Sequence, residues 1–572
     1  MHYQSLVTAL SLGSAALALH GQFPINIAEE IGARPLDITN SNPGHLNSIS
    51  SNSEQWRFDE CPPENATGNL IFDTVHSLLQ HWPNTRYRNG HNIVPGVIPI
   101  GTLLYHGTNG SRIIPSGPEW TAMNPEHSIY FSRGNGSGWH LTLAATRPLK
   151  VLYFDGSSAA KLSEGTMDVQ DIIAWGEPRP ERSFDEGDRI NALCAWGKEF
   201  GIDGFVSEVM LCDFTAGVEV VSFVHIALPR DDRSFPLSTS VDPNTCQSST
   251  CGLWHNRYPG DSRIVLDLTG LISLYDTALA PSLISARAGF GRLDHRVFGI
   301  SSDDISRVMR KLIKVVTRPH PVGSGIDWKT LLHVIVDRYA DRLELTRYLL
   351  NVTLSDPQEL LERAKLVQFQ LRVMLTPYLL HSTAIPNTGT LGIYLSQWAS
   401  PIFSLCVTTH TSQITNLKPL MTSSELLLLK AVEDTTREIC RITIKMWAVG
   451  VMSGFDTLFP IELNGELDVT QIMNDWRQDI GKLMSWLDWS VWIKCRPACG
   501  PEEMCYLSTW PINAPRPERP LLSPRNSQNL TNFPETQYVA DRVTQPKYPT
   551  MPAEDWGLPQ PRCIRRLQPY GF

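Results

Sequence analysis

The stretch Val218-Glu-Val-Val-Ser-Phe-Val-His-Ile226 is rich in β-branched side chains and predicts a β-strand. Shorter runs of the same kind precede it at 101–106, 128–131, 149–154 and 204–206. Helical patterns lie between these runs, around 74–81 and 186–200. Short strands that alternate with helices in this way predict an α+β domain over residues 61–228.

Beyond residue 260 the apolar residues recur with the period of an α-helix, and the chain predicts an all-α helical bundle over 261–510. One helix start is complete: Asp356 is placed as N-cap, Pro357 as the first helical residue and Glu359 as the third. Similar apolar stripes occupy 327–350, 423–449 and the segment from 468. A Cys-containing linker is predicted over 229–260, and the proline-rich residues 511–572 predict an extended tail.

The composition excludes one large class of partner. The chain has 572 residues, with 49 Lys and Arg against 58 Asp and Glu, and a formal net charge of −9. A protein that binds a phosphate backbone needs a surplus of cations, so no nucleic-acid partner is predicted. No stretch has the roughly 20 uninterrupted apolar residues of a membrane span, and the oligomeric state stays open.

The N-terminal residues predict secretion. Residues 1–18 form a short apolar run that ends in Ala16 and Ala18, as a signal peptide does before its cleavage site. Residues 19–60 are rich in Asn, Ser, Pro and Gly and predict a flexible N-terminal segment. Sequons for N-glycosylation occur at Asn65, Asn109, Asn135, Asn351 and Asn529. Together these features predict a secreted, extracellular glycoprotein.

Eleven cysteines also fit an oxidising compartment. A zinc site needs a second closely spaced cysteine pair together with a histidine, so disulfide bonds are predicted there rather than a metal site. These cysteines are Cys246, Cys251, Cys495, Cys499 and Cys505. Four others lie in apolar segments and are predicted to be buried thiols: Cys194, Cys212, Cys406 and Cys440. The pairing itself does not follow from the sequence.

The usual signatures of serine hydrolases, zinc proteases, P-loop enzymes and dehydrogenases are absent, and the candidate residues lie in the first domain. A predicted strand ends in His106-Gly107-Thr108, a second contains Tyr130, and a third contains Glu219. A histidine followed by glycine can hydrogen-bond a flat ligand, and a tyrosine can stack on it. A carboxylate can stabilise positive charge at an anomeric carbon. Each residue taken alone fits a structural role better: His106 as a hydrogen-bonded structural residue, Tyr130 in the core and Glu219 on a solvated strand face.

Taken in order, these motifs resemble the His-Tyr-Glu branch of the ADP-ribosyltransferase superfamily. The run Gly201-Ile-Asp-Gly-Phe205, followed by the strand with Glu219, is also similar to secreted-toxin and tankyrase-type relatives. The resemblance covers roughly 61–228 and implies an ADP-ribosyltransferase-like fold with a split β-sheet. The whole chain resembles large secreted proteins of filamentous fungi, a resemblance that implies no function.

The resemblance implies NAD as the substrate, no metal, and a protein or small molecule as acceptor. His106 would bind a ribose hydroxyl, the backbone of Gly107 would hold the nicotinamide amide, and Tyr130 would stack on the nicotinamide ring. Glu219 would bind the ribose 2′-hydroxyl and stabilise an oxocarbenium-like transition state. Thr108 and Ser132 complete the implied NAD-binding set.

Some features depart from this family pattern. The charged insert Glu177–Arg182 has no assigned role, and Gly217 stands where arginine-modifying relatives have a second acid. A glycan on Asn109 would crowd the cleft, and Glu208 is an alternative to Glu219 as the acid. Two functions therefore stay open. The protein is either a secreted NAD glycohydrolase or ADP-ribosyltransferase, or a non-catalytic secreted glycoprotein that uses the fold as a binding module.

Overall fold

The computed structural model describes residues 57–80, 90–109, 112–132, 138–156, 167–206, 209–226, 263–318, 322–352, 354–380, 398–459, 467–506 and 561–565. All of these residues belong to one compact unit of the chain. The predicted signal peptide, nearly all of the N-terminal segment 19–60 and the whole linker 229–260 lie outside the described residues.

The described strands form one mixed sheet, one antiparallel sheet and one antiparallel pair. The largest sheet has the order β10-β1-β5-β6-β7-β3, with β9 also paired to β1, and only β5 and β6 run parallel. Its members are β1 (Asn92–Ile98), β3 (Glu119–Thr121), β5 (Leu149–Phe154), β6 (Gly204–Val206), β7 (Val209–Leu211), β9 (Val265–Leu266) and β10 (Ile272–Ser273). A three-stranded sheet joins β2 (Leu103–Asn109), β4 (Gly138–Ala145) and β8 (Val218–Ile226), and a third pairs β11 (Glu503–Tyr506) with β12 (Arg562–Arg565).

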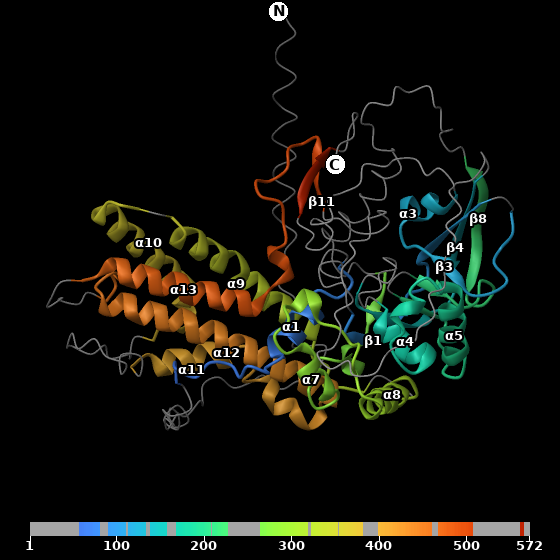
Figure 1. Ribbon diagram of the computed structural model, residues 1–572, viewed down its shortest axis with the longest axis horizontal. Coiled ribbons are helices and arrows are strands. Elements are labelled where there is room, and N and C mark those ends of the chain that lie inside the picture. Colours follow the sequence, from blue (N-terminus) through green and yellow to red (C-terminus); the bar gives the residue numbers. More distant parts are fainter. Residues whose placement is uncertain are drawn as a thin grey trace, which may run out of the picture. The chain divides into compact units, whose positions relative to one another are not determined.

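Helices flank the sheets and then dominate the second half of the chain. The first group is α1 (Gly68–His76), α3 (Pro125–Ile129), α4 (Asp168–Trp175), α5 (Glu186–Lys198), α7 (Ser282–Arg287) and α8 (Ser302–Val316). The second group is α9 (Trp328–Leu350), α10 (Pro357–Leu375), α11 (Ser400–Thr408), α12 (Ser423–Met452) and α13 (Val469–Leu487). Helices α9, α10, α12 and α13 contact one another and lie side by side (Figure 1). Among the described helices, none has both the length and the hydrophobicity to cross a lipid bilayer.

The α+β class is confirmed, and so are the helix starts predicted near residues 186, 327, 357, 423 and 468. The helix predicted around 74–81 is wrong in its bounds, because α1 begins at Gly68 and ends at His76. The side chain of Asp356 accepts a hydrogen bond from the amide of Gln358, and α10 begins at Pro357. The predicted stripe of α10 is buried, from Ala364 through Val367 to Met374. Local caps and local periodicity are enough to place these helices, because both signals act within one or two turns.

The predicted division at residue 260 does not coincide with a division of the core. Strands β9 and β10 lie beyond that residue and pair with β1. One buried cluster includes Phe72 and Tyr153 from the α+β part together with Trp328 and Trp447 from the long helices. The two parts therefore share one hydrophobic core.

The predicted strand over 128–131 is wrong, because these residues are helical. They span the end of α3 and the 3₁₀ turn η4 (Tyr130–Ser132). Pro125 is the first residue of α3, a position that suits its fixed φ, and the Ser128 hydroxyl donates back to the Pro125 carbonyl at 2.8 Å. A short apolar run such as Ile-Tyr-Phe fits a strand or a helix equally well, so these neighbouring contacts decide.

The cysteines form four disulfides in the described part of the chain. Cys495–Cys505 and Cys499–Cys563 confirm the prediction for the crowded cysteines, and the second bond ties β12, in the C-terminal tail, to the segment before its partner strand β11. The prediction of buried thiols is wrong, because Cys194 bonds Cys212 and Cys406 bonds Cys440. Their Cα atoms are 5.5 and 6.0 Å apart, a separation that packing sets and that local sequence does not report. Cys61 is a free, exposed thiol, and Cys246 and Cys251 lie outside the described residues.

Candidate functional site

His106 lies on β2, in a rung that continues through Leu141 of β4 to Phe223 of β8. Residues directly opposite one another share a face of a sheet, so these three side chains point the same way. Nδ1 of His106 is 2.7 Å from the carbonyl oxygen of Trp120 and therefore carries a hydrogen. His106 is half-buried, and its ring meets the edge of Phe214.

Glu219 lies on the opposite face of the same sheet. It pairs with Ala144, which pairs with Leu103, and this rung is three residues along β2 from His106. An odd separation on a regular strand puts two residues on opposite faces. The register of β8 shifts between its partners Thr142 and Leu143, so β8 has one extra residue there. Glu219 is exposed, and the structure does not bring it to the His106 side.

Gly107 and Ser132 pack α3 and η4 against the sheet. A Cβ atom on Gly107 would lie 1.9 Å from the Ser128 carbonyl oxygen and 2.6 Å from Oγ of Ser132. Ser132 donates to the carbonyl of Trp139, and Oγ of Ser128 is 2.6 Å from Nε2 of His140. Tyr130 lies in η4, and its side chain is outside the described part of the structure. Gly107 thus has a packing reason to be glycine that needs no ligand.

Replacing Gly107 by Ala is expected to destabilise the protein by about 1–3 kcal/mol, because the added methyl group forces α3 away from β2. Urea unfolding measures the loss. The matched control is Gly117→Ala, since a Cβ atom at Gly117 meets nothing within 4 Å. Equal stability of the two variants would contradict the packing role of Gly107.

The His106 face of the sheet ends in a group of aromatic and basic side chains, here called the aromatic rung. Thr108, Trp139 and His225 are direct neighbours across β2, β4 and β8. The rings of Trp139 and His225 are 5.1 Å apart, and the Arg112 guanidinium lies 5.7 Å from the Trp139 ring centre. Arg112 and His225 are exposed, so the aromatic rung offers stacking and cationic groups to a ligand.

The structure also shows where Gly217 and two of the predicted glycosylation sites lie. Gly217 has a φ of +74°, which suits glycine and explains why no second acid occupies this position. Asn65 and Asn351 are exposed, as a glycan acceptor must be. The side chain of Asn109 lies outside the described part of the structure, as do the residues Asn135, Asn529 and Glu208.

The charged insert Glu177–Arg182 has a structural role. Arg182 lies 4.0 Å from the ring centre of Trp175 and pairs with Asp185 and Asp188. The backbone amide of Arg179 donates to Asp171 at 2.9 Å. These contacts fold the insert back onto α4 and α5, so it does not mark a separate site.

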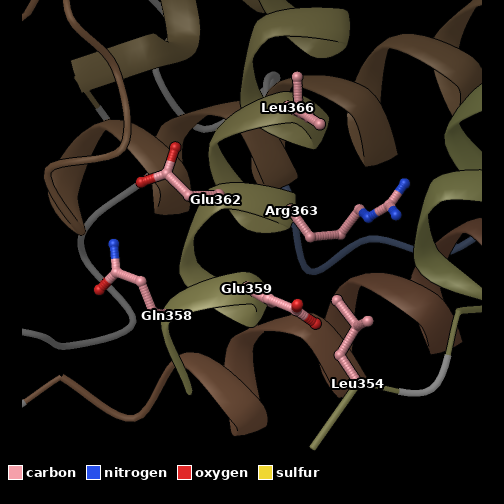
Figure 2. Close-up of a pocket in the computed structure, with 6 residues that line it drawn as sticks. All are labelled: Leu354, Gln358, Glu359, Glu362, Arg363 and Leu366. Carbon is pink, nitrogen blue, oxygen red and sulfur yellow. The ribbon is translucent and has the colours of Figure 1, made fainter. Parts of the chain in front are cut away.

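A shallow groove of about 400 Å³ lies along the start of α10. Its lining residues are Leu354, Gln358, Glu359, Glu362, Arg363 and Leu366. Figure 2 shows that Gln358 and Glu362 point to one side of the helix, whereas Glu359 and Arg363 point to the other. Polar groups that diverge in this way do not form a catalytic site, which requires convergent side chains.

A buried polar group, here called the Tyr275 cluster, is the feature that sequence reasoning missed. It joins seven side chains from α1, from α7 and the segments around it, and from the residues next to β1 and β5: Asp73, His91, Asp155, Tyr275, Arg287, Arg292 and His295. Asp73 accepts from Arg292 at 3.0 Å and from the amide of Ser490 at 3.0 Å. Asp155 accepts from the amides of His91 and Asn92 and from the Asn92 side chain.

Burial shifts the acid–base properties of this cluster strongly. It raises the pKa of Asp155 to about 6, against the effect of the hydrogen bonds from Asn92 and His91. Burial, with the charge of Arg287, lowers the pKa of His295 to about 4. The sequence signal was present but weak, since Arg287, Arg292 and His295 flank the turn at Gly289–Gly291 and nothing local shows that all three are buried.

Comparison with known proteins matches the first part of the chain. Residues 58–139 and 132–247 match the family described as the YPL277C N-terminal domain. The "Uncharacterized protein YPL277C" of Saccharomyces cerevisiae is 32% identical over 30% of this chain and 46% of the relative. The "Uncharacterized protein YOR389W" of the same yeast is 33% identical over 30% of this chain and 35% of the relative.

The chain thus spans less than half the length of these curated relatives. No solved structure matches the chain. The two stretches that match the family include β1 to β8 and every residue of the implied NAD site.

Proposed function

We propose that the α+β part is an ADP-ribosyltransferase-like binding module of a secreted, disulfide-bonded glycoprotein, and that it binds NAD or a related nucleotide without cleaving it. The observation that carries this proposal is the register of β8, which puts Glu219 on the face opposite His106. A catalytic carboxylate needs to lie within hydrogen-bond reach of the group on which it acts. The sheet itself separates Glu219 from a ligand held by His106.

Two further observations support the fold and the location. The three-stranded sheet meets the larger sheet at a bridge between Tyr105 and Ala122, in keeping with a split sheet. Four disulfides are rare in proteins of a reducing cytosol and common in secreted proteins. Exposed sequon residues at Asn65 and Asn351 fit a secreted glycoprotein.

The aromatic rung and His106 are the groups proposed to bind the ligand. Trp139 and His225 offer ring faces to a base or nicotinamide, and Arg112 offers a cation to a phosphate. Because Nδ1 of His106 is held by the Trp120 carbonyl, Nε2 is the ring nitrogen left to bind a ribose hydroxyl.

A second candidate is NAD cleavage, the activity that the resemblance implies for His106 and Glu219, which share the three-stranded sheet but lie on its opposite faces. The test measures NAD binding by calorimetry and nicotinamide release by the secreted protein. We expect binding with no release above buffer, and about tenfold weaker binding after His225→Ala or Arg112→Ala. Val224→Ala is the matched control, since Val224 is an exposed neighbour on the other face of β8.

Two results would contradict this proposal. Nicotinamide release that falls about a hundredfold in Glu219→Gln would establish NAD cleavage in place of the binding module. Absence of NAD binding would exclude NAD as the ligand of the aromatic rung.

A further inference from the structure

Arg287 is a buried arginine with one unused edge. It is the last residue of α7 and is only 8% exposed. Its Nη1 donates to the carbonyl of Leu274 at 3.0 Å. Its Nε and Nη2 are both buried and have no hydrogen-bond partner. Buried polar groups are rarely left without a partner, and a buried charge is more costly still.

The unused pair of nitrogens is the edge with which arginine binds an oxyanion in two parallel hydrogen bonds. Arg441 uses the same edge on Glu438, with both distances at 2.7 Å. Arg296 uses it on Asp168, at 3.3 and 3.0 Å. Among the ion pairs of the described residues, none includes Arg287. The edge that these arginines use to bind a carboxylate therefore has no carboxylate partner at Arg287 among the described residues.

The surroundings of Arg287 do not supply an internal counter-charge. Its guanidinium lies 4.5 Å from the ring centre of Tyr275, and the ring of His91 stacks on the same tyrosine at 4.2 Å. Both acids of the cluster have other partners. Asp73 accepts from Arg292 and from Ser490. Asp155 accepts from the backbone amides of His91 and Asn92 and from the Asn92 side chain. Burial lowers the pKa of the Arg287 guanidinium to about 10, so it is still a cation at neutral pH.

We propose that the Nε–Nη2 edge of Arg287 binds a small oxyanion, the carboxylate or phosphate group of a ligand. Tyr275 forms the stacked wall of this site. Arg287 is buried, whereas Ala288, Gly289 and Phe290, which follow it in the sequence, are exposed. The site uses residues beyond those that match the known family and does not depend on the proposed NAD-binding face.

The test is thermal unfolding of the full secreted chain in sodium phosphate, sodium acetate or sodium chloride at equal ionic strength. A ligand that binds the folded state raises the melting temperature. We expect phosphate, acetate or both to raise it above the chloride value, and the more effective anion identifies the ligand group. In Arg287→Met the anion concentration needed for the same rise in melting temperature is expected to be at least tenfold higher, since the variant removes two charge-assisted hydrogen bonds.

Two further variants separate the site from general effects. Arg287→Lys keeps the positive charge but lacks the planar Nε–Nη2 edge. It is expected to need about tenfold more anion for the same rise in melting temperature. Arg310→Met removes an exposed arginine of α8 and is expected to respond as the wild type does. Wild-type protein that responds to neither anion would overturn the proposal, and so would an unchanged response in either Arg287 variant.

Discussion

Replacing Asp73 by Ala is expected to lower the free energy of unfolding by about 3–5 kcal/mol. The side chain of Asp73 is fully buried, and that of its partner Arg292 is 4% exposed. One carboxylate oxygen accepts from Arg292, and the other accepts from the amide and the hydroxyl of Ser490. The variant leaves a buried guanidinium without its counter-charge and a buried amide without its acceptor. Both losses add to the cost.

Urea unfolding tests this prediction, because a shift of the midpoint at constant slope reports a change in stability. The control is Glu362→Ala, which breaks an exposed pair with Lys365 and is expected to cost less than about 1 kcal/mol. A double variant, Asp73→Leu with Arg292→Met, is expected to recover part of the loss, since neither charge is then buried alone. A loss in Asp73→Ala no larger than that of the control would contradict the role of this ion pair.

This ion pair also shows why the shared core did not follow from the sequence. Asp73 is separated by 219 residues from Arg292 and by 417 from Ser490. Periodicity identifies a buried helix face and gives no information on which distant segment covers it. The helix starts at Pro357 and Val469 were predictable because their caps lie within the same few residues. The packing of α1 against the long helices, which joins the α+β and helical parts, was not predictable from the sequence.

The direction of Glu219 depends on a single extra residue in β8. In a regular strand Glu219 and Phe223 are four residues apart and share a face, which is the His106 face. The extra residue in β8 reverses the direction of every side chain before it, so Glu219 turns to the other face. Nothing in Val218-Glu-Val-Val-Ser-Phe223 marks this bulge, because any residue of the run can be the extra one. The strand was predictable from its composition and the direction of the glutamate was not.

Two variants of the Tyr275 cluster, Asp155→Asn and His295→Gln, are expected to differ from the wild type in stability. These differences are expected to change in opposite directions as the pH rises. Burial raises the pKa of Asp155 from 3.8 to about 6. Between these values the folded state binds a proton that the unfolded state has released. The stability that this proton provides is present at pH 4 and is lost as the pH rises through 6. A shift of about two pKa units corresponds to about 3 kcal/mol.

His295 acts in the opposite direction. Its pKa falls from 6.5 to about 4 on folding, so the unfolded state binds the extra proton between these values. Its contribution to stability is therefore lost as the pH falls from 6.5 to 4. The two groups titrate over overlapping ranges near Arg292, which acts on both. Their effects largely cancel in the wild-type protein, and single variants are needed to show either one.

Asp155→Asn is expected to fold. In the wild type, Nδ2 of Asn92 donates to Asp155, and half a turn of the Asn92 amide group would instead present its unpartnered Oδ1 to the new amide. Its stability relative to wild type is expected to rise by about 3 kcal/mol from pH 4 to pH 7, since only the wild type buries a charge above pH 6. For His295→Gln the same difference is expected to fall over this range. Urea unfolding at intervals of half a pH unit measures both. Slopes of the same sign would show that Asp155 and His295 do not carry the opposed proton equilibria that their burial implies.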